Sequence, residues 1–126
     1  MAKGTVLIVD DEPDVRASIS IALTNDGYDV IEAEEGEQAL EALDSGQTID
    51  LILCDMYMPN VNGLEAVTLF RSSYQSIPVI VLTGKPDAQY AKRLFEQGVS
   101  VYLVKPLEQE ALLATVHKVL QGKPKS

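Results

Sequence analysis

The sequence predicts an α/β fold in which five strands form one parallel sheet and five helices cover it. The first observation is that five short apolar segments alternate along the chain with five segments whose apolar residues have helical spacing. The second is that the first strand segment is apolar on both faces, which is typical of a parallel strand buried between two layers of helices. The third is the length of 126 residues, 46% of them hydrophobic, which suits one globular domain.

The first strand is predicted at residues 5–9, a β-branched apolar run that stops at two aspartates. A helix should begin near Pro13, because proline is tolerated in the first turn and acidic residues are favourable there. Its buried stripe is predicted from apolar residues at helical spacing, namely Val15, Ile19, Ala22 and Leu23. Gly27 should end the helix, since it can adopt the left-handed conformation.

The second pair of elements is an outer strand at residues 28–33 and a helix from about Glu37 to Asp44. The third strand is an apolar run that begins at Leu51 and is closed by Pro59, with Asp55 at the carboxyl end of the strand. Packing alone does not explain a carboxylate in that position.

The remaining elements follow the same alternation. We expect a helix from Gly63, a strand at 77–82, a helix from Pro86-Asp87, a strand at 99–104 and a helix from about 108 to 120. The helix after Pro86 has four apolar residues at helical spacing, Tyr90, Ala91, Leu94 and Phe95. One domain is expected over residues 1–121, followed by a polar tail or the start of a linker over residues 122–126.

Composition limits the classes of partner and compartment. The formal net charge of −9 argues against direct binding to nucleic acid and favours a basic partner or a bound cation. No apolar run is long enough for a membrane span, and the single cysteine, Cys54, excludes an internal disulfide. We expect a cytoplasmic protein in which Cys54 is an inert core thiol.

Polar residues interrupt the apolar strands at corresponding places. Strand ends carry carboxylate, hydroxyl and ammonium groups: Asp10, Asp11, Asp55, Thr83 and Lys105. In a parallel sheet all of them lie at one edge, where ligands of such sheets bind. Two unit charges about 4 Å apart repel by roughly 4 kcal/mol at an effective dielectric near 20, so three carboxylates need a cation.

An all-oxygen site that keeps some waters suits Mg²⁺, with Mn²⁺ as a substitute. Lys105 can hold a second anion, for which phosphate is the obvious candidate. Asp55 is then a candidate nucleophile, because aspartate can form an acyl phosphate. The hydroxyl of Thr83 could hydrogen-bond a phosphate oxygen.

Four segments together resemble the CheY-like receiver domain of two-component response regulators. They are Val9-Asp10-Asp11-Glu12, Asp55-Met56-Tyr57-Met58-Pro59 with Gly63, Leu82-Thr83-Gly84 and Val104-Lys105-Pro106. The resemblance covers about residues 5–120 and implies a single doubly wound, flavodoxin-like sheet with strand order 2-1-3-4-5.

The resemblance also implies roles for individual residues. Asp55 would accept a phosphoryl group from a sensor histidine kinase or a phosphotransfer protein, and the domain would not be an enzyme acting on external substrates. Asp11, Asp55 and the backbone carbonyl of Tyr57 would bind Mg²⁺ directly, and Asp10 would act mainly through water. Lys105 would contact the phosphoryl oxygens.

Further family features concern switching. The Lys105–Pro106 bond would be cis, Thr83 would move toward the phosphate, and Tyr102 would turn inward. The fourth helix, the fifth strand and the last helix would form the surface that changes. They would act on a downstream protein or output domain outside this chain, and phosphorylation-dependent dimerisation stays open.

Two positions are variable in such domains and help to set how long the phosphate lasts. They are Tyr57, two residues after Asp55, and Lys85, two residues after Thr83. A bulky ring and a long cation could hinder the attacking water, so we hypothesise a slowly decaying phosphoprotein.

Three other functions compete with this interpretation. A Mg²⁺-dependent phosphatase of the haloacid-dehalogenase type would carry an acid where this chain has Tyr57. A flavodoxin-like cofactor module would need a loop rich in Ser, Thr and Gly after the first strand, where this chain has Asp-Asp-Glu-Pro. A pseudo-receiver would keep the fold without the chemistry, although the acceptor-site residues are all present.

Overall fold

The computed structural model describes residues 2–55, 63–84 and 87–122. The strands are β1 (Thr5–Val9), β2 (Asp29–Ala33), β3 (Leu51–Asp55), β4 (Val79–Thr83) and β5 (Val101–Val104). The helices are α1 (Pro13–Asn25), α2 (Gly36–Asp44), α3 (Gly63–Ser73), α4 (Ala88–Glu96) and α5 (Gln109–Gln121). All strand pairs are parallel and the sheet order is β2-β1-β3-β4-β5, which confirms the predicted fold class.

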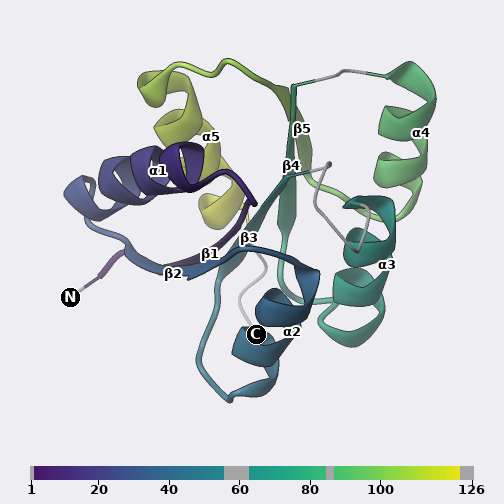
Figure 1. Ribbon diagram of the computed structural model, residues 1–126, viewed down its shortest axis with the longest axis horizontal. Coiled ribbons are helices and arrows are strands. Elements are labelled where there is room, and N and C mark those ends of the chain that lie inside the picture. The colour runs from purple at the N-terminus through teal and green to yellow at the C-terminus, as the bar shows by residue number, and fades with distance from the viewer. Residues whose placement is uncertain (1, 56–62, 85–86, 123–126) are drawn as a thin grey trace.

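Two layers of helices enclose the sheet. Helices α1 and α5 cover one face, and α2, α3 and α4 cover the other (Figure 1). Successive side chains of a strand point to opposite faces, so each strand supplies both cores. In β3, Leu51 and Leu53 join the core under α1 and α5, whereas Ile52 and Cys54 join the other core. Every residue of β3 and β4 is buried, and this apolar centre fixes where their polar last residues lie.

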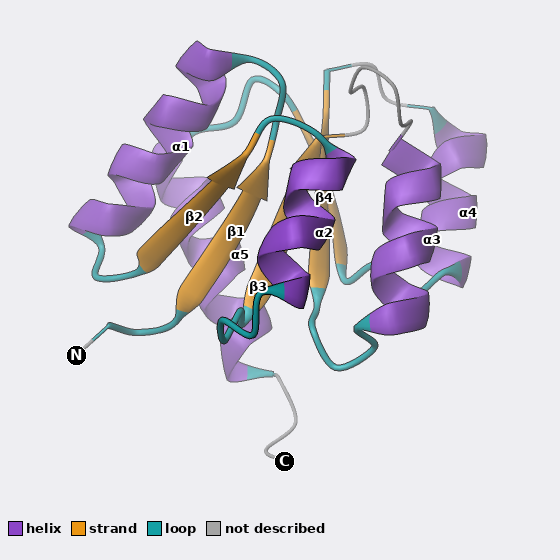
Figure 2. Ribbon diagram, turned by 60° about the horizontal axis from the view of Figure 1, so that its bottom comes forward, coloured by secondary structure: helices purple, strands orange, loops and turns teal. Residues whose placement is uncertain are grey.

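The carboxyl ends of all five strands meet at one edge of the sheet (Figure 2). The register places Val9 beside Cys54, Asp55 beside Leu82, and Thr83 beside Val104. The polar residues at these strand ends are therefore brought together by strand pairing. No helix in residues 2–55, 63–84 and 87–122 has the length and apolar character needed to cross a membrane.

The four apolar residues at helical spacing in α4 are not all buried. Leu94 is buried, but Phe95 is 52% exposed and Tyr90 is 37% exposed. Helix α4 lies toward the β5 edge of the sheet (Figure 1), and a helix at the edge of a sheet has less apolar surface to pack against. The Phe95 ring instead packs edge-on against Tyr102 of β5, with 6.5 Å between ring centroids.

The fifth strand begins at Val101, two residues later than the sequence predicts. Gly98 has a φ of 96°, and the Val99 N–H still bonds to the Leu94 carbonyl, so residues 98 and 99 form the turn that follows α4. The chain is extended only after this turn.

Candidate functional site

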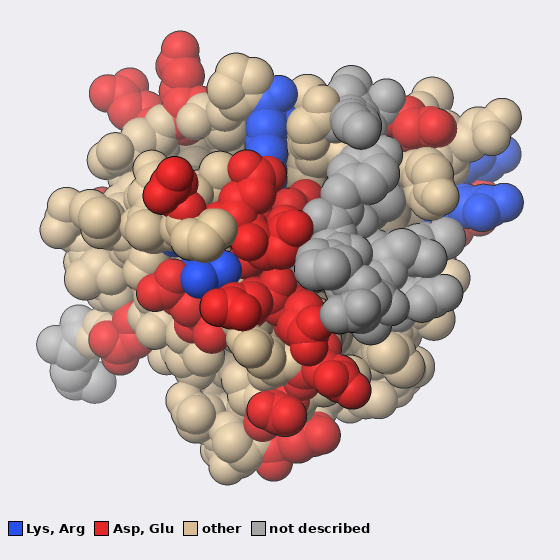
Figure 3. All heavy atoms as spheres, viewed as in Figure 1, with Lys and Arg blue, Asp and Glu red and all other residues tan. Residues whose placement is uncertain are grey.

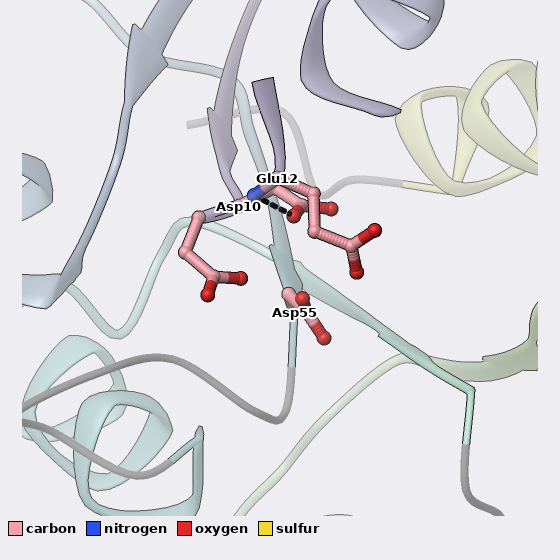
Figure 4. A group of neighbouring side chains, drawn as sticks. Asp10, Glu12 and Asp55 are labelled. Carbon is pink, nitrogen blue, oxygen red and sulfur yellow. Dashed lines mark hydrogen bonds between the residues drawn. The ribbon is translucent and has the colours of Figure 1, made fainter. Parts of the chain in front are cut away.

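The acidic centre lies at the carboxyl edge of the sheet. Asp10 follows β1 and is 1% exposed, while Asp55 ends β3 and is 3% exposed. Ligand atoms of Asp10, Asp11, Glu12 and Asp55 all lie within 4.8 Å of one another. Figure 4 shows Asp10 and Glu12 beside Asp55 of the neighbouring strand. The tertiary structure therefore gathers all three predicted carboxylates and adds a fourth.

Asp10 is held through its backbone and its side chain. Its N–H donates to the carbonyl of Ala33 at 3.1 Å, which ties the turn after β1 to the end of β2. Its Oδ1 accepts the N–H of Glu12 at 2.9 Å (Figure 4). An aspartate that accepts an N–H two residues later forms a local turn, so the sequence Asp-Asp-Glu folds its own acids toward the site.

Lys105 is the ammonium group that faces these acids. Its Nζ lies 3.2 Å from Asp10 Oδ2, 3.3 Å from Asp55 Oδ2 and 3.8 Å from Glu12 Oε1. The backbone N–H of Lys105 donates to the Thr83 carbonyl at 2.7 Å, and the Lys105–Pro106 peptide bond is cis. Lys105 thus reaches both buried carboxylates from the end of β5.

The electrostatics of the site follow from this arrangement. Burial by itself lowers the pKa of Lys105, but the carboxylates of Asp55 and Asp10 outweigh burial and raise the pKa above 10.5. Lys105 is therefore charged at neutral pH. Three of the four clustered acids, Asp10, Glu12 and Asp55, lie within 4.0 Å of this ammonium. Asp and Glu side chains gather near the middle of the face seen in Figure 3.

The donor set fits a hard divalent cation. It consists of carboxylate oxygens, two of them on buried residues, and these are the ligands that Mg²⁺ and Mn²⁺ prefer. A thiolate is not available, since burial raises the pKa of the Cys54 thiol, as do the charges of Asp55 and Asp10. Cys54 is fully buried in the core, as the sequence predicts.

Thr83 and Tyr102 lie on neighbouring strands beside this centre. Thr83 is fully buried at the end of β4. Tyr102 pairs with Val81, two residues before Thr83, so Tyr102 and Thr83 project to the same face of the sheet. The half-buried Tyr102 directs its hydroxyl outward, where it accepts the N–H of Asp87 at 3.2 Å.

Two of the predicted residues cannot be placed. Tyr57 and Lys85 lie outside the described residues. Glu12 is an acid of this centre that is not among the predicted site residues, although it ends the Val9-Asp10-Asp11-Glu12 segment. The uninterrupted Asp-Asp-Glu run at a strand end was the available signal.

Comparison with known proteins gives a consistent set of matches. Residues 6–117 match the family described as "Response regulator receiver domain". The chain is 39% identical over 114 residues to the CAI-1 autoinducer sensor kinase/phosphatase CqsS of Vibrio cholerae, covering 88% of this chain and 16% of that protein. It is 37% identical over 119 residues to the response regulator ArlR of Staphylococcus saprophyticus, covering 94% and 53%.

A solved structure agrees in fold and sequence. The chemotaxis protein CheY4 of Vibrio cholerae is similar with a TM-score of 0.87 and 33% identity, and the match covers 94% of this chain and 99% of that one. The chain spans only about half, or less, of the length of the two curated relatives named above.

Proposed function

The chain belongs to the response regulator receiver domain family of two-component signalling, and we propose that it is a switch controlled by phosphorylation of Asp55 in the presence of Mg²⁺. Receiver domains interact with sensor histidine kinases and with output domains, and they are generally not catalytic enzymes. The observation that carries the proposal is the position of Lys105 Nζ, 3.3 Å from Asp55 and 3.2 Å from Asp10.

The transfer is a displacement at phosphorus. A carboxylate oxygen of Asp55 attacks the phosphorus of a phosphohistidine, a new P–O bond forms, and the P–N bond breaks. The bonding electrons remain on the imidazole nitrogen, which takes up a proton. Lys105 neutralises negative charge on the phosphoryl oxygens as they arrive, and its position between two carboxylates holds it ready for that role.

The metal would be held by Asp11 and Asp55 directly, by the backbone carbonyl of Tyr57, and by Asp10 through water. Bound there, Mg²⁺ would neutralise charge that develops on the transferring group. The cluster of four carboxylates supports this assignment, because Lys105 pairs with three of them and a bound cation would offset the remaining negative charge.

The switch would pass from Thr83 to Tyr102. Phosphorylation adds about −1.5 to −2 charge and three acceptor oxygens near Thr83 and Lys105. A shift of Thr83 toward that phosphate would release space on the face of the sheet that Tyr102 shares. Tyr102 would then exchange its bond to the Asp87 N–H for an inward position, which would alter the surface of α4, β5 and α5.

The partners of this site are proposed from the same chemistry. The donor would be a sensor histidine kinase or a phosphotransfer protein, and the receiver of the signal would be a downstream protein or output domain. A net charge of −9 argues against direct nucleic acid binding by this domain.

The test is intact mass after incubation with acetyl phosphate, with Mg²⁺ or with a chelator in its place. A single base-labile phosphoryl adduct that needs the metal is the expected result. No adduct with acetyl phosphate or with a purified sensor kinase would favour a pseudo-receiver. Repeated turnover of external phosphate esters would favour the phosphatase.

The lifetime of the phosphate gives a further prediction. Replacing both Tyr57 and Lys85 with alanine should shorten the half-life of the phosphoprotein several-fold, because a bulky ring and a long cation would no longer hinder the attacking water. The half-life is measured by intact mass after removal of the donor. Slower decay in the double variant than in the parent would contradict the hypothesis, and Lys92→Ala, on α4, is the surface control.

A further inference from the structure

Arg16 connects three parts of the chain beneath the acidic centre. Its Nη1 donates to the backbone carbonyl of Asp10 at 2.7 Å. Its Nε donates to Glu32 of β2 at 3.1 Å, and its Nη2 lies 3.9 Å from Glu34. The guanidinium is the group that can do this, because its donors diverge from a rigid planar fork.

The turn at residues 10–12 is bound to Arg16 on both sides. The Arg16 side chain holds the carbonyl of Asp10, and the Arg16 backbone N–H donates to the carbonyl of Glu12 at 2.9 Å. The Asp10 N–H is fixed separately by Ala33. With both peptide groups of Asp10 bonded, the direction of the following carboxylates depends on Arg16.

The contact with the carbonyl matters more than the ion pairs. The side chains of Glu32 and Glu34 are 45% and 66% exposed, and exposed pairs of this kind contribute little. The Arg16 side chain is itself only 13% exposed, and the carbonyl that accepts its short hydrogen bond belongs to Asp10, which is buried. A role limited to joining α1 to β2 would account for the contacts with Glu32 and Glu34 but not for the hydrogen bond to the Asp10 carbonyl.

We propose that Arg16 is a positioning residue for the cation site, which it serves by fixing the backbone that carries Asp10, Asp11 and Glu12. The inference rests on the proposed Mg²⁺ binding. Positioning and charge predict opposite changes in Mg²⁺ affinity, because Arg16 is itself a cation close to the cation site. By charge alone, removal of Arg16 should strengthen Mg²⁺ binding; by loss of positioning, removal should weaken it.

The experiment measures Mg²⁺ affinity by isothermal titration calorimetry on the intact chain. Arg16→Gln should weaken Mg²⁺ binding about tenfold, as the loss of outer-shell partners of metal ligands does at the low end of its range. Arg16→Lys should recover only part of the affinity, since one ammonium cannot reproduce the fork. Lys3→Gln removes the same charge from a half-exposed residue paired with Asp26, and should stay within about twofold of the parent.

Folding and site geometry are checked separately. Thermal unfolding should remain cooperative in each variant, and the amide resonances of residues 10–12 in the metal-free Arg16→Gln protein should shift. Unchanged or tighter Mg²⁺ binding in a folded Arg16→Gln protein would overturn the inference. Failure of the parent to bind Mg²⁺ would instead refute the proposed function, so the two failures are distinguishable.

Discussion

Asparagine at position 55 should abolish the phosphoryl adduct completely. The amide has nearly the same shape as the carboxylate, so the buried end of β3 should keep its fold, but the amide lacks the anionic oxygen that attacks phosphorus. Intact mass after incubation with acetyl phosphate and Mg²⁺ is the measurement. The expected change is from a single adduct in the parent to none in Asp55→Asn.

The matched control is Asp29→Asn, an exposed residue at the opposite end of the sheet, where β2 begins. It removes the same charge and should leave the adduct unchanged. A surviving adduct in Asp55→Asn would mean that Asp10, Asp11 or Glu12 is the acceptor. Borohydride reduction followed by peptide mapping would identify which residue carries the phosphate.

Loss of the Lys105 ammonium should produce the second large effect, on stability. In metal-free protein, Lys105→Met should lower the free energy of unfolding by about 3 kcal/mol, because it leaves two buried carboxylates without their shared cation. Urea unfolding followed by circular dichroism measures the change. Lys3→Met, which breaks an exposed pair with Asp26, should cost less than about 1 kcal/mol.

Two conditions should reduce the difference in the free energy of unfolding between the parent and Lys105→Met, which is called the gap below. A cation that binds only the folded state at about 100 times its Kd adds roughly 2.7 kcal/mol, and Mg²⁺ should restore the variant more than the parent if it replaces the missing charge. The pKa of Lys105 is raised in the folded state, so its contribution is fully present below pH 10.5 and is lost as pH rises through the raised pKa. The gap should therefore close at strongly alkaline pH. A gap that is unaffected by both Mg²⁺ and alkaline pH would show that Lys105 acts through packing.

The sequence by itself determined the fold class and most of the polar residues that gather at the carboxyl edge of the sheet. Apolar runs that alternate with helical stripes require a parallel sheet between helices, and polar residues at the ends of parallel strands must share one edge. The sequence alone therefore places Asp10, Asp55, Thr83 and Lys105 at one edge of the sheet. The carboxyl-terminal position of each residue in its strand is a local property, which the sequence displays directly.

Only the tertiary structure decided which groups touch. The contacts of Lys105 with Asp10 and Glu12 cross more than ninety residues of chain, and no local pattern encodes them. The local turn at Asp10 and Glu12 lies beside Asp55 because β1 pairs with β3, and Arg16 reaches Glu32 because β2 pairs with β1. Phe95 and Tyr90 share helical spacing with the buried Leu94 and are nevertheless exposed, because helical spacing identifies an apolar face but not how much sheet is available to cover it. Those outcomes depend on how the elements pack, and packing is a property of the whole chain.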